Sequence, residues 1–342
     1  MEKMKEPRLI NRSVLIRTLF VFTVILLSFL SLSTIAQSTT ANQNIDFLQV
    51  AADEDLQTII NNARAHQTLQ LLPGIYTQQL RITKPLTITS SNPETTIISA
   101  TTLPNQPAIS ITADDVTLKN LTIQNNADGI YTTAIRITAE NTMITNCIIH
   151  HTPVGIAIWT SNNTITQSRF HHCADEGIVL LTTSYSPCRN NIISHCTFTH
   201  NCDAIELQQS THNQIINCTM THNTHSGIDA IIKNNDHNII SSCTITDNQV
   251  HGIYLSSSSN NLISSCHITN NTDGNIIQPN SFHNTILNQS HLTQQKNLLL
   301  EQNSIERQTP SSVLSLIKQK ITSIQLQIIN MLQTFLSFHS PA

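Results

Sequence analysis

The stretch NQIINCTMTHN at residues 213–223 decides the fold, because it returns as NIISSCTITDN at 238–248 and as NLISSCHITNN at 261–271. Each copy alternates apolar and polar residues with a period of two, which is typical of short β-strands. The first asparagine, the cysteine and the last asparagine keep their places in all three copies. A repeat of this regularity predicts a solenoid of stacked units.

Two columns of small residues extend the repeat over more than 100 residues. One column holds cysteine or serine at steps of 21 to 28 residues: Cys147, Ser168, Cys196, Cys218, Cys243, Cys266 and Ser290. The other keeps step with it: Gly155, Gly177, Ala204, Gly227, Gly252 and Gly274. Each unit of about 22 residues contains three β-rich runs separated by Asn, Ser or Gly corners. We therefore predict an all-β fold, a single right-handed parallel β-helix over residues 69–305, with three strands per coil and coils stacked about 4.8 Å apart.

Both ends of this solenoid are expected to carry helices. Residues 37–68 form an N-terminal segment whose part 55–65 places apolar residues on one side, as a helix that caps the first coil: Leu56, Ile59, Ile60 and Ala63. Apolar residues at helical spacing predict an amphipathic helix over residues 311–339. That helix packs on the solenoid in one interpretation, and in the other it contacts a membrane surface or a partner protein.

The N-terminus has the pattern of an export signal. Basic residues precede an apolar run over 18–32, and small residues follow at 34–36, so we predict a signal peptide at residues 1–36. The protein is then periplasmic, cell-surface or secreted, and the alternative is an uncleaved membrane anchor. The formal net charge of −4 argues against a nucleic-acid partner, which a basic surface would bind.

Stacking also sets expectations for asparagine and cysteine. Asparagines in one corner column are expected to form a hydrogen-bonded ladder along the axis: Asn201, Asn223, Asn248 and Asn271. The cysteines of the repeat column are expected to be small buried residues, because parallel side chains seldom reach disulfide geometry. A disulfide among Cys173, Cys188 and Cys202 stays open.

These features resemble a known group of proteins. The repeats, together with LQLLPGIY at 69–76 and KPLTI at 84–88, resemble the parallel β-helix proteins of the pectin-lyase-like superfamily, in particular the NosD-like periplasmic group. The resemblance covers residues 50–300. It implies a periplasmic location and a copper-related role.

A histidine column follows the cysteine column at a distance of four residues. Its members are His151, His172, His200 and His222. Imidazoles about 5 Å apart in stacked coils could share a metal ion, and copper is the cofactor that the resemblance implies. The alternative is that histidine replaces asparagine as a stacked corner residue.

Candidate site residues fall on the strand after the corner glycine. Alternation predicts that Glu206 and Asp229 lie side by side on adjacent coils of one exposed face, with Asp203 at the corner near them, as candidate catalytic carboxylates. The candidate ligand-binding residues of this face are Trp159, Tyr254, Gln208 and His251, and Ile231 is expected beside Gln208. An exposed tryptophan can stack on a sugar ring, so the predicted partner is a polysaccharide or surface glycan.

Three functions remain open from the sequence. The first is an exported, non-catalytic binding protein with a glycan-like ligand. The second is a carbohydrate-active lyase, hydrolase or epimerase, although the arginine pattern of pectate lyases is absent from the sequence. The third is a NosD-like copper-accessory protein. Whether the chain is an enzyme is not decided by these patterns.

Overall fold

A computed structural model describes residues 47–287, and these residues carry the fold. The predicted signal peptide at 1–36 and the predicted helix at 311–339 lie outside the described residues, as do residues 37–46 and 288–305. Within residues 47–287, no helix is both long and apolar enough to cross a membrane.

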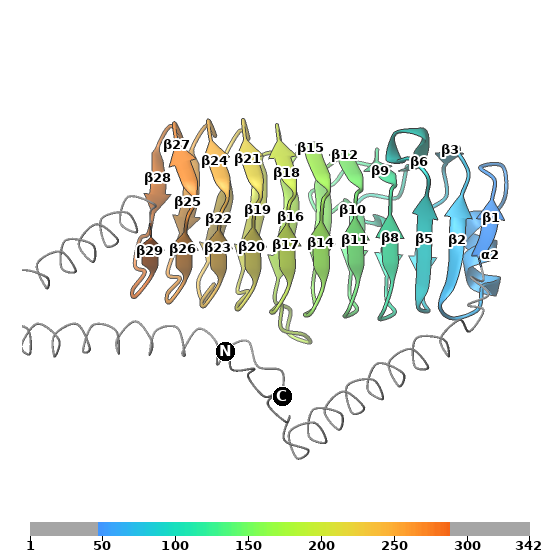
Figure 1. Ribbon diagram of the computed structural model, residues 1–342, viewed down its shortest axis with the longest axis horizontal. Coiled ribbons are helices and arrows are strands. Elements are labelled where there is room, and N and C mark those ends of the chain that lie inside the picture. Colours follow the sequence, from blue (N-terminus) through green and yellow to red (C-terminus); the bar gives the residue numbers. More distant parts are fainter. Residues whose placement is uncertain (1–46, 288–342) are drawn as a thin grey trace, which may run out of the picture. The chain divides into compact units, whose positions relative to one another are not determined.

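Residues 49–287 form a parallel β-helix, which confirms the predicted fold. The chain passes in turn through three parallel sheets, which we call A, B and C, and each circuit pairs with the circuit before it. Figure 1 shows the strands of successive circuits side by side, in sequence order along the long axis. Because each strand pairs with its equivalents one coil away, the spacing along the sequence translates directly into position on a face.

The strands are short, as expected where corners recur every few residues. Sheet A contains β1 (Phe47–Val50), β2 (Gln67–Leu71), β5 (Leu86–Ser90), β8 (Thr117–Lys119), β11 (Met143–Thr145), β14 (Thr164–Thr166), β17 (Ile192–Ser194), β20 (Gln214–Ile216), β23 (Ile239–Ser241), β26 (Leu262–Ser264) and β29 (Thr285–Leu287). Sheet B contains β3 (Gly74–Tyr76), β6 (Thr96–Ala100), β9 (Thr122–Asn125), β12 (Ile148–Thr152), β15 (Arg169–Cys173), β18 (Thr197–Thr199), β21 (Thr219–Thr221), β24 (Thr244–Thr246) and β27 (His267–Thr269). Sheet C contains β4 (Leu80–Ile82), β7 (Pro107–Ile111), β10 (Thr133–Ile137), β13 (Val154–Ile158), β16 (Glu176–Leu181), β19 (Asp203–Gln208), β22 (Ile228–Ile232), β25 (His251–Leu255) and β28 (Gly274–Ile277). A 3-10 turn, η1 (Pro93–Thr95), follows β5.

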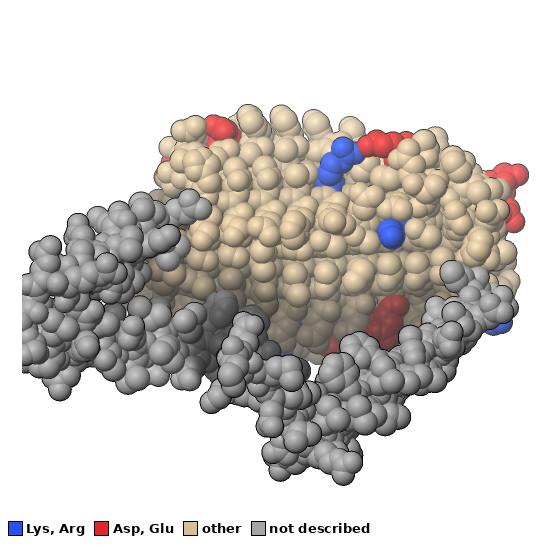
Figure 2. Space-filling view, viewed as in Figure 1, with Lys and Arg blue, Asp and Glu red and all other residues tan. Residues whose placement is uncertain are grey.

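The core is built from columns of identical residues. In sheet A, Ile215 pairs with Ile240 and Ile240 with Ile263, and all three side chains are buried. Complete burial of one such side chain stabilises the fold by roughly 1.5–3 kcal/mol. The outer surface in Figure 2 carries few and scattered charged side chains, in agreement with a charged content of 11%. Apolar burial and backbone pairing therefore dominate the stability.

Helix α2 (Leu56–Asn62) caps the first coil, as predicted. It begins at Asp55, whose carboxylate accepts a hydrogen bond from the backbone N–H of Thr58 at 3.1 Å. Leu56 and Ile60 are fully buried in the core and Ile59 packs against it. The short helix thus covers the apolar end that the first coil would otherwise expose.

The predicted asparagine ladder runs along one corner, inside the helix. The side-chain N–H of Asn223 donates to Oδ1 of Asn248 at 2.8 Å, and that of Asn248 donates to Oδ1 of Asn271 at 2.9 Å. Each Oδ1 also accepts the backbone N–H of the asparagine one coil before, at 3.1 Å in both cases. The ladder therefore satisfies buried polar groups that the tight corner removes from the strand pairing.

A second asparagine ladder follows another corner and was not predicted as a ladder. It links Asn191 to Asn213 at 3.1 Å, Asn213 to Asn238 at 3.2 Å and Asn261 to Asn284 at 3.1 Å. The two ladders hold two corners of every coil in that part of the chain at a common register.

The cysteines of the repeat column are buried or half-buried, as expected, and all eight cysteines are free thiols. The thiol of Cys218 lies 3.6 Å from the carbonyl oxygen of Ile193 and 3.4 Å from that of Ile216. Ser168 makes the equivalent contact with the carbonyl of Thr166 at 2.9 Å. A small side chain that donates to a carbonyl is what the position requires.

Replacement of Asn248 by alanine should destabilise the protein by about 2–4 kcal/mol, because the buried amide groups of both neighbouring asparagines lose partners. Thermal and denaturant unfolding followed by circular dichroism measures the change. Gln249→Ala is the matched control, since this adjacent side chain is exposed, and it should change stability by less than about 0.5 kcal/mol. Equal effects of the two substitutions would contradict a structural role for the ladder.

Candidate functional site

The outer face of sheet C brings the predicted carboxylates together. Glu206 of β19 pairs in register with Asp229 of β22, and Glu176 of β16 pairs with Asp203 of β19. Tyr254 of β25 lies in register with Asp229. The predicted alignment of Glu206 with Asp229 on adjacent coils is therefore confirmed.

Two details of this face differ from the expectation. The carboxylates were expected to be exposed, but Asp203, Glu206 and Asp229 retain only 5%, 5% and 3% of their accessible surface. Coils about 4.8 Å apart pack outward side chains closely enough to cover one another. In addition, the register shifts within β19 and β22, so that Gln208 pairs with Ile232 and not with Ile231.

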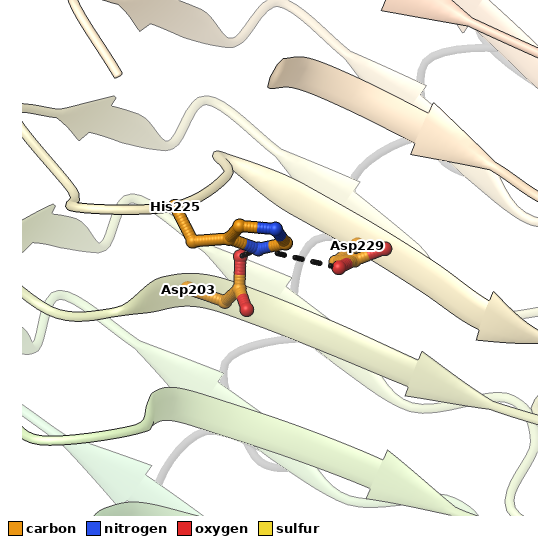
Figure 3. Close-up of side chains that lie close together, drawn as sticks. All are labelled: Asp203, His225 and Asp229. Carbon is orange, nitrogen blue, oxygen red and sulfur yellow. Dashed lines mark hydrogen bonds and ion pairs between the residues drawn. The ribbon is translucent and has the colours of Figure 1, made fainter. Parts of the chain in front are cut away.

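A histidine that the sequence analysis did not select completes the site. Nδ1 of His225, in the corner before β22, lies 2.8 Å from Oδ1 of Asp203 and 3.4 Å from Oδ2 of Asp229 (Figure 3). The backbone N–H of Ser226 donates to the same Oδ1 of Asp203 at 2.7 Å. These contacts fix the imidazole between two buried carboxylates, while its side chain keeps 39% of its surface exposed.

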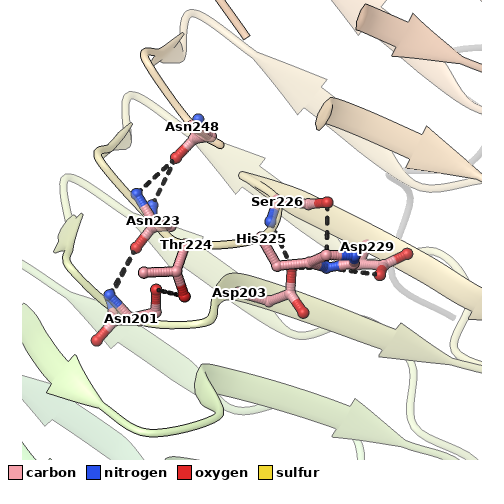
Figure 4. Close-up of polar contacts among 8 residues, drawn as sticks. All are labelled: Asn201, Asp203, Asn223, Thr224, His225, Ser226, Asp229 and Asn248. Carbon is pink, nitrogen blue, oxygen red and sulfur yellow. Dashed lines mark hydrogen bonds and ion pairs between the residues drawn. The ribbon is translucent and has the colours of Figure 1, made fainter. Parts of the chain in front are cut away.

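The corner explains why His225 was missed. His225 and Asp175 occupy one corner column with Cys202, as shown by backbone hydrogen bonds from Cys202 to Asp175 at 2.9 Å and from His225 to Cys202 at 2.9 Å. Cys202 follows its ladder asparagine directly, whereas His225 is two residues after Asn223. Figure 4 shows this corner between the ladder and the carboxylates. Because the turn at Cys202 is one residue shorter, counting residues from the ladder asparagine does not align His225 with Cys202. The backbone hydrogen bonds of the folded coils do align them, and they bring His225 next to Asp203.

Burial and mutual repulsion change the protonation of the carboxyl groups. Burial, with the charges of Asp203 and Glu206, raises the pKa of Asp229 to about 7. Burial, a hydrogen bond with Glu206 and the charge of Asp175 raise the pKa of Glu176 to about 10. Burial also raises the pKa of Asp203, although His225 and the Ser226 N–H oppose this shift. These buried carboxyl groups thus cannot all be ionised together, because too little positive charge lies near them to offset their repulsion.

The pKa of His225 is raised overall, although its burial alone would lower it. Desolvation lowers the pKa of His225, but the nearby carboxylates of Asp203, Asp229 and Glu206 outweigh it and raise the pKa overall. Among the described residues, His225 is the one basic group that forms an ion pair with these carboxylates. We call Glu176, Asp203, Glu206, His225 and Asp229 the acidic centre.

Aromatic residues flank the acidic centre on the same face. Trp159 packs against an outer cluster of Val154, Ala157 and Val179, and the guanidinium of Arg136 lies 4.9 Å from the centre of a Trp159 ring. On the other side, Tyr254 stacks on His251 at 4.9 Å between ring centres. Gln208 donates through Nε2 to Oε1 of Glu206. Gln208, His251 and Tyr254 therefore adjoin the centre, whereas Trp159 lies farther along the same face, with Val179 between it and Glu206. Each of the four is partly exposed.

The predicted histidine column lies on the far side of sheet B from the core. His172 stacks on His200 at 5.3 Å, and both His151 with His172 and His200 with His222 stack at 5.8 Å. All four have positive φ between 48° and 59°. Histidine, asparagine and aspartate accept this left-handed conformation more readily than most residues, so the corner backbone accounts for the residue types in the column.

Comparison with known proteins gives one family. Overlapping segments 86–187 and 136–318 match the family model described as periplasmic copper-binding protein (NosD), and together they span more than half of the chain. The chain belongs to the NosD family. A periplasmic family agrees with export of this NosD-family protein. No curated protein sequence matches the chain.

Solved structures share the fold of this NosD-family chain at low sequence identity. The A-module of the mannuronan C-5 epimerase AlgE6 from Azotobacter vinelandii is 14% identical with a TM-score of 0.57, over 67% of this chain and 70% of that chain. The pectate lyase Pel9A is 13% identical with a TM-score of 0.50, over 70% and 76%. The Dettilon tailspike protein (gp208) is 13% identical with a TM-score of 0.50, over 70% and 61%. At these identities the likeness shows the parallel β-helix fold alone.

The description of the NosD family raises the question of which residues could hold copper. Donor atoms of Asp203, His225 and Asp229 lie within 4.8 Å of one another, the one such trio among residues 47–287. This trio offers two carboxylate oxygens and one imidazole nitrogen, a donor set with little of the nitrogen ligation that copper prefers. Exposed imidazoles in sheet B have no carboxylate contact of this kind and suit copper better.

The acidic centre predicts an unusual dependence of stability on pH. The folded-state pKa of Asp229, about 7, lies above its unfolded value near 3.8, so the folded protein binds more protons than the unfolded chain between these pH values. Stability should therefore fall as the pH rises from 4 to 7. The raised pKa of Asp229 corresponds to a loss of at most ~4 kcal/mol in the free energy of unfolding. A loss of half this size would lower Tm by roughly 4–8 °C.

Asp229→Asn should accordingly raise Tm at pH 8 and flatten the pH dependence, measured by thermal unfolding between pH 5 and 8. Asp247→Asn removes the charge of an exposed corner carboxylate and serves as control. An Asp229→Asn protein that is no more stable than this control at pH 8 would show that the carboxylate of Asp229 is not destabilised by its neighbours.

Proposed function

We propose that this NosD-family protein binds a glycan along the outer face of sheet C and that His225 transfers protons to or from the bound sugar. The observation that carries the proposal is the position of His225. Its Nδ1 faces Asp203 and Asp229, which are buried, whereas its ring is partly exposed and presents Nε2 from the opposite edge (Figure 3). A histidine oriented by a buried carboxylate is a recurring arrangement for general acid–base catalysis.

In this proposal the predicted catalytic carboxylates have positioning roles. Asp203 and Asp229 are nearly inaccessible, so they orient the imidazole and stabilise its protonated form instead of touching the sugar. Glu206 belongs to the same centre and lies in register with Asp229. His225 is the residue we propose as catalytic.

The flanking aromatics supply the proposed sugar-binding surface. Trp159 follows β13 and Tyr254 lies in β25, four coils apart, which corresponds to roughly 19 Å along the axis. Partly exposed aromatic rings at both ends of this span can stack on sugar rings, while Gln208 offers a polar group between them and His251 offers one beside Tyr254. The solved structures compared above include a mannuronan epimerase and a pectate lyase, which by their names act on polysaccharides.

The charge of the centre favours a neutral glycan. Asp175 adds a fifth carboxyl group beside Glu176, and its pKa is raised by burial and by the charge of Glu206. A polyuronate would bring further negative charge to a surface that already has too little positive charge. We therefore propose a neutral polysaccharide as ligand, in contrast to mannuronan and pectate.

The test is a panel of neutral and uronate polysaccharides, with binding and product release measured on the same samples. His225→Gln should lower kcat by about 100-fold or more and leave binding nearly unchanged. Asp203→Asn should lower kcat and shift the pH profile of the reaction, because the imidazole loses its closest carboxylate. Trp159→Ala should weaken binding by roughly 3- to 10-fold.

Glu140→Gln, an exposed carboxylate outside this face, is the control and should leave both measurements unchanged. Binding without any product from the wild-type protein would contradict the catalytic part and leave a non-catalytic glycan-binding protein. Preference for polyuronates would contradict the argument from charge.

We propose copper binding as a second function, because the matching family is described as periplasmic copper-binding protein. The exposed imidazoles of sheet B support it, since neutral imidazole nitrogen is a suitable copper ligand. Burial and the neighbouring histidines lower the pKa of His150 to about 4. The imidazole therefore carries no extra proton at neutral pH.

A further inference from the structure

Two histidine pairs lie side by side on adjacent coils of sheet B. His150 and His151 belong to β12, and His171 and His172 belong to β15. His150 and His171 are partners in the strand register. The four imidazoles thus form a two-by-two arrangement on the outside of the β-helix, on the opposite side of the sheet from the core.

The rings are arranged regularly within this group. Rings in equivalent positions are stacked, with centres 4.9 Å apart for His150 and His171 and 5.8 Å apart for His151 and His172. Rings within a pair are close to perpendicular, at 80° and 89°. In both pairs the Nδ1 atoms face each other, at 3.0 Å for His171 and His172 and in a still shorter contact for His150 and His151.

Backbone conformation explains only half of this group. His151 and His172 have positive φ, like the later members of their column, so their residue type has a local cause. His150 and His171 are strand residues without positive φ. Later coils place threonine at the same register, at Thr199, Thr221 and Thr246. His150 and His171 therefore stand where later coils have threonine, at positions whose backbone does not require histidine.

The facing nitrogens match the spacing of ligands on one metal ion. With metal–nitrogen distances of about 2.0 Å, two adjacent ligand atoms are roughly 2.8 Å apart at a right angle and roughly 3.3 Å apart in a tetrahedron. The 3.0 Å between Nδ1 of His171 and Nδ1 of His172 falls between these values. A hydrogen bond between two Nδ1 atoms requires a proton on one of them, and a metal ion replaces this proton as the shared partner.

We propose that His150, His151, His171 and His172 hold one copper ion between the two coils, a site that rests on the second proposed function. No three donor nitrogens of these histidines lie within 4.8 Å of one another in the structure, so binding requires the exposed rings of His151 and His172 to tilt toward an ion that lies between the coils. Four imidazole nitrogens suit the tetragonal or tetrahedral preference of copper. Carboxylates are not needed in this site.

The remainder of the histidine column supplies a matched control. His200 and His222 stack in the same column and have the same positive φ, but their preceding residues are Thr199 and Thr221. They therefore lack the facing Nδ1 partner. Stacking alone makes no site in this proposal, so these two histidines are outside it.

The test uses the exported chain, titrated with Cu²⁺ and followed by calorimetry and by electron paramagnetic resonance. The wild-type protein should bind one ion with hyperfine structure from several nitrogen atoms. His150→Thr and His171→Thr, which restore the residue of later coils, should each weaken binding by at least roughly tenfold and reduce the nitrogen coupling. His200→Asn and His222→Asn keep a residue that accepts positive φ and should leave both unchanged.

The possible results separate the site from the function. Copper binding of unchanged strength in His150→Thr and His171→Thr would overturn this site and leave copper binding elsewhere in the protein. Equal losses in all four variants would overturn it in favour of unspecific binding along the column. Failure of the wild-type protein to bind copper would overturn both the site and the second proposed function.

Discussion

The hydrogen bonds that join each coil to the next are the interaction on which the rest of this structure depends. Strand pairing fixes the register along three sheets, and the two asparagine ladders extend it through corners where strand pairing ends. Because the register is fixed, a residue type that recurs in the sequence becomes a column in space. The isoleucine core, the thiol column and the stacked histidines are consequences of this one constraint.

The same constraint forces like charges together on the outer face of sheet C. Glu206 and Asp229 would repel each other if both were ionised, and the fold gives them no room to separate. The raised pKa of Asp229 and the charge of the His225 imidazole relieve this repulsion in part. Such a centre lowers stability at neutral pH, and residues that cost stability in this way are often retained for function. The apolar columns of the core provide stability that offsets this loss.

The sequence was sufficient for the fold because the repeat encodes its own register. It predicted the pairing of Glu206 with Asp229 and the ladder at Asn201 correctly, since both follow from counting residues between corners. Counting failed where a coil differs in length or a strand is irregular: the short turn at Cys202 concealed His225, and the shift in β22 replaced Ile231 by Ile232. Alternation predicted which way side chains point, but burial depends on neighbouring coils, so the enclosure of Asp203 could not be read from it.

The central claim is that equivalent side chains lie one coil apart, and nuclear Overhauser contacts between isoleucine methyl groups test it most directly. Protein with selectively labelled isoleucine methyl groups should show contacts from Ile215 to Ile240 and from Ile240 to Ile263, and no contact from Ile215 to Ile263. Assignment by substitution of single isoleucines with valine identifies each signal. A direct contact between Ile215 and Ile263, or the absence of contacts between neighbours in this column, would contradict the stacking and with it every site described on the outer faces.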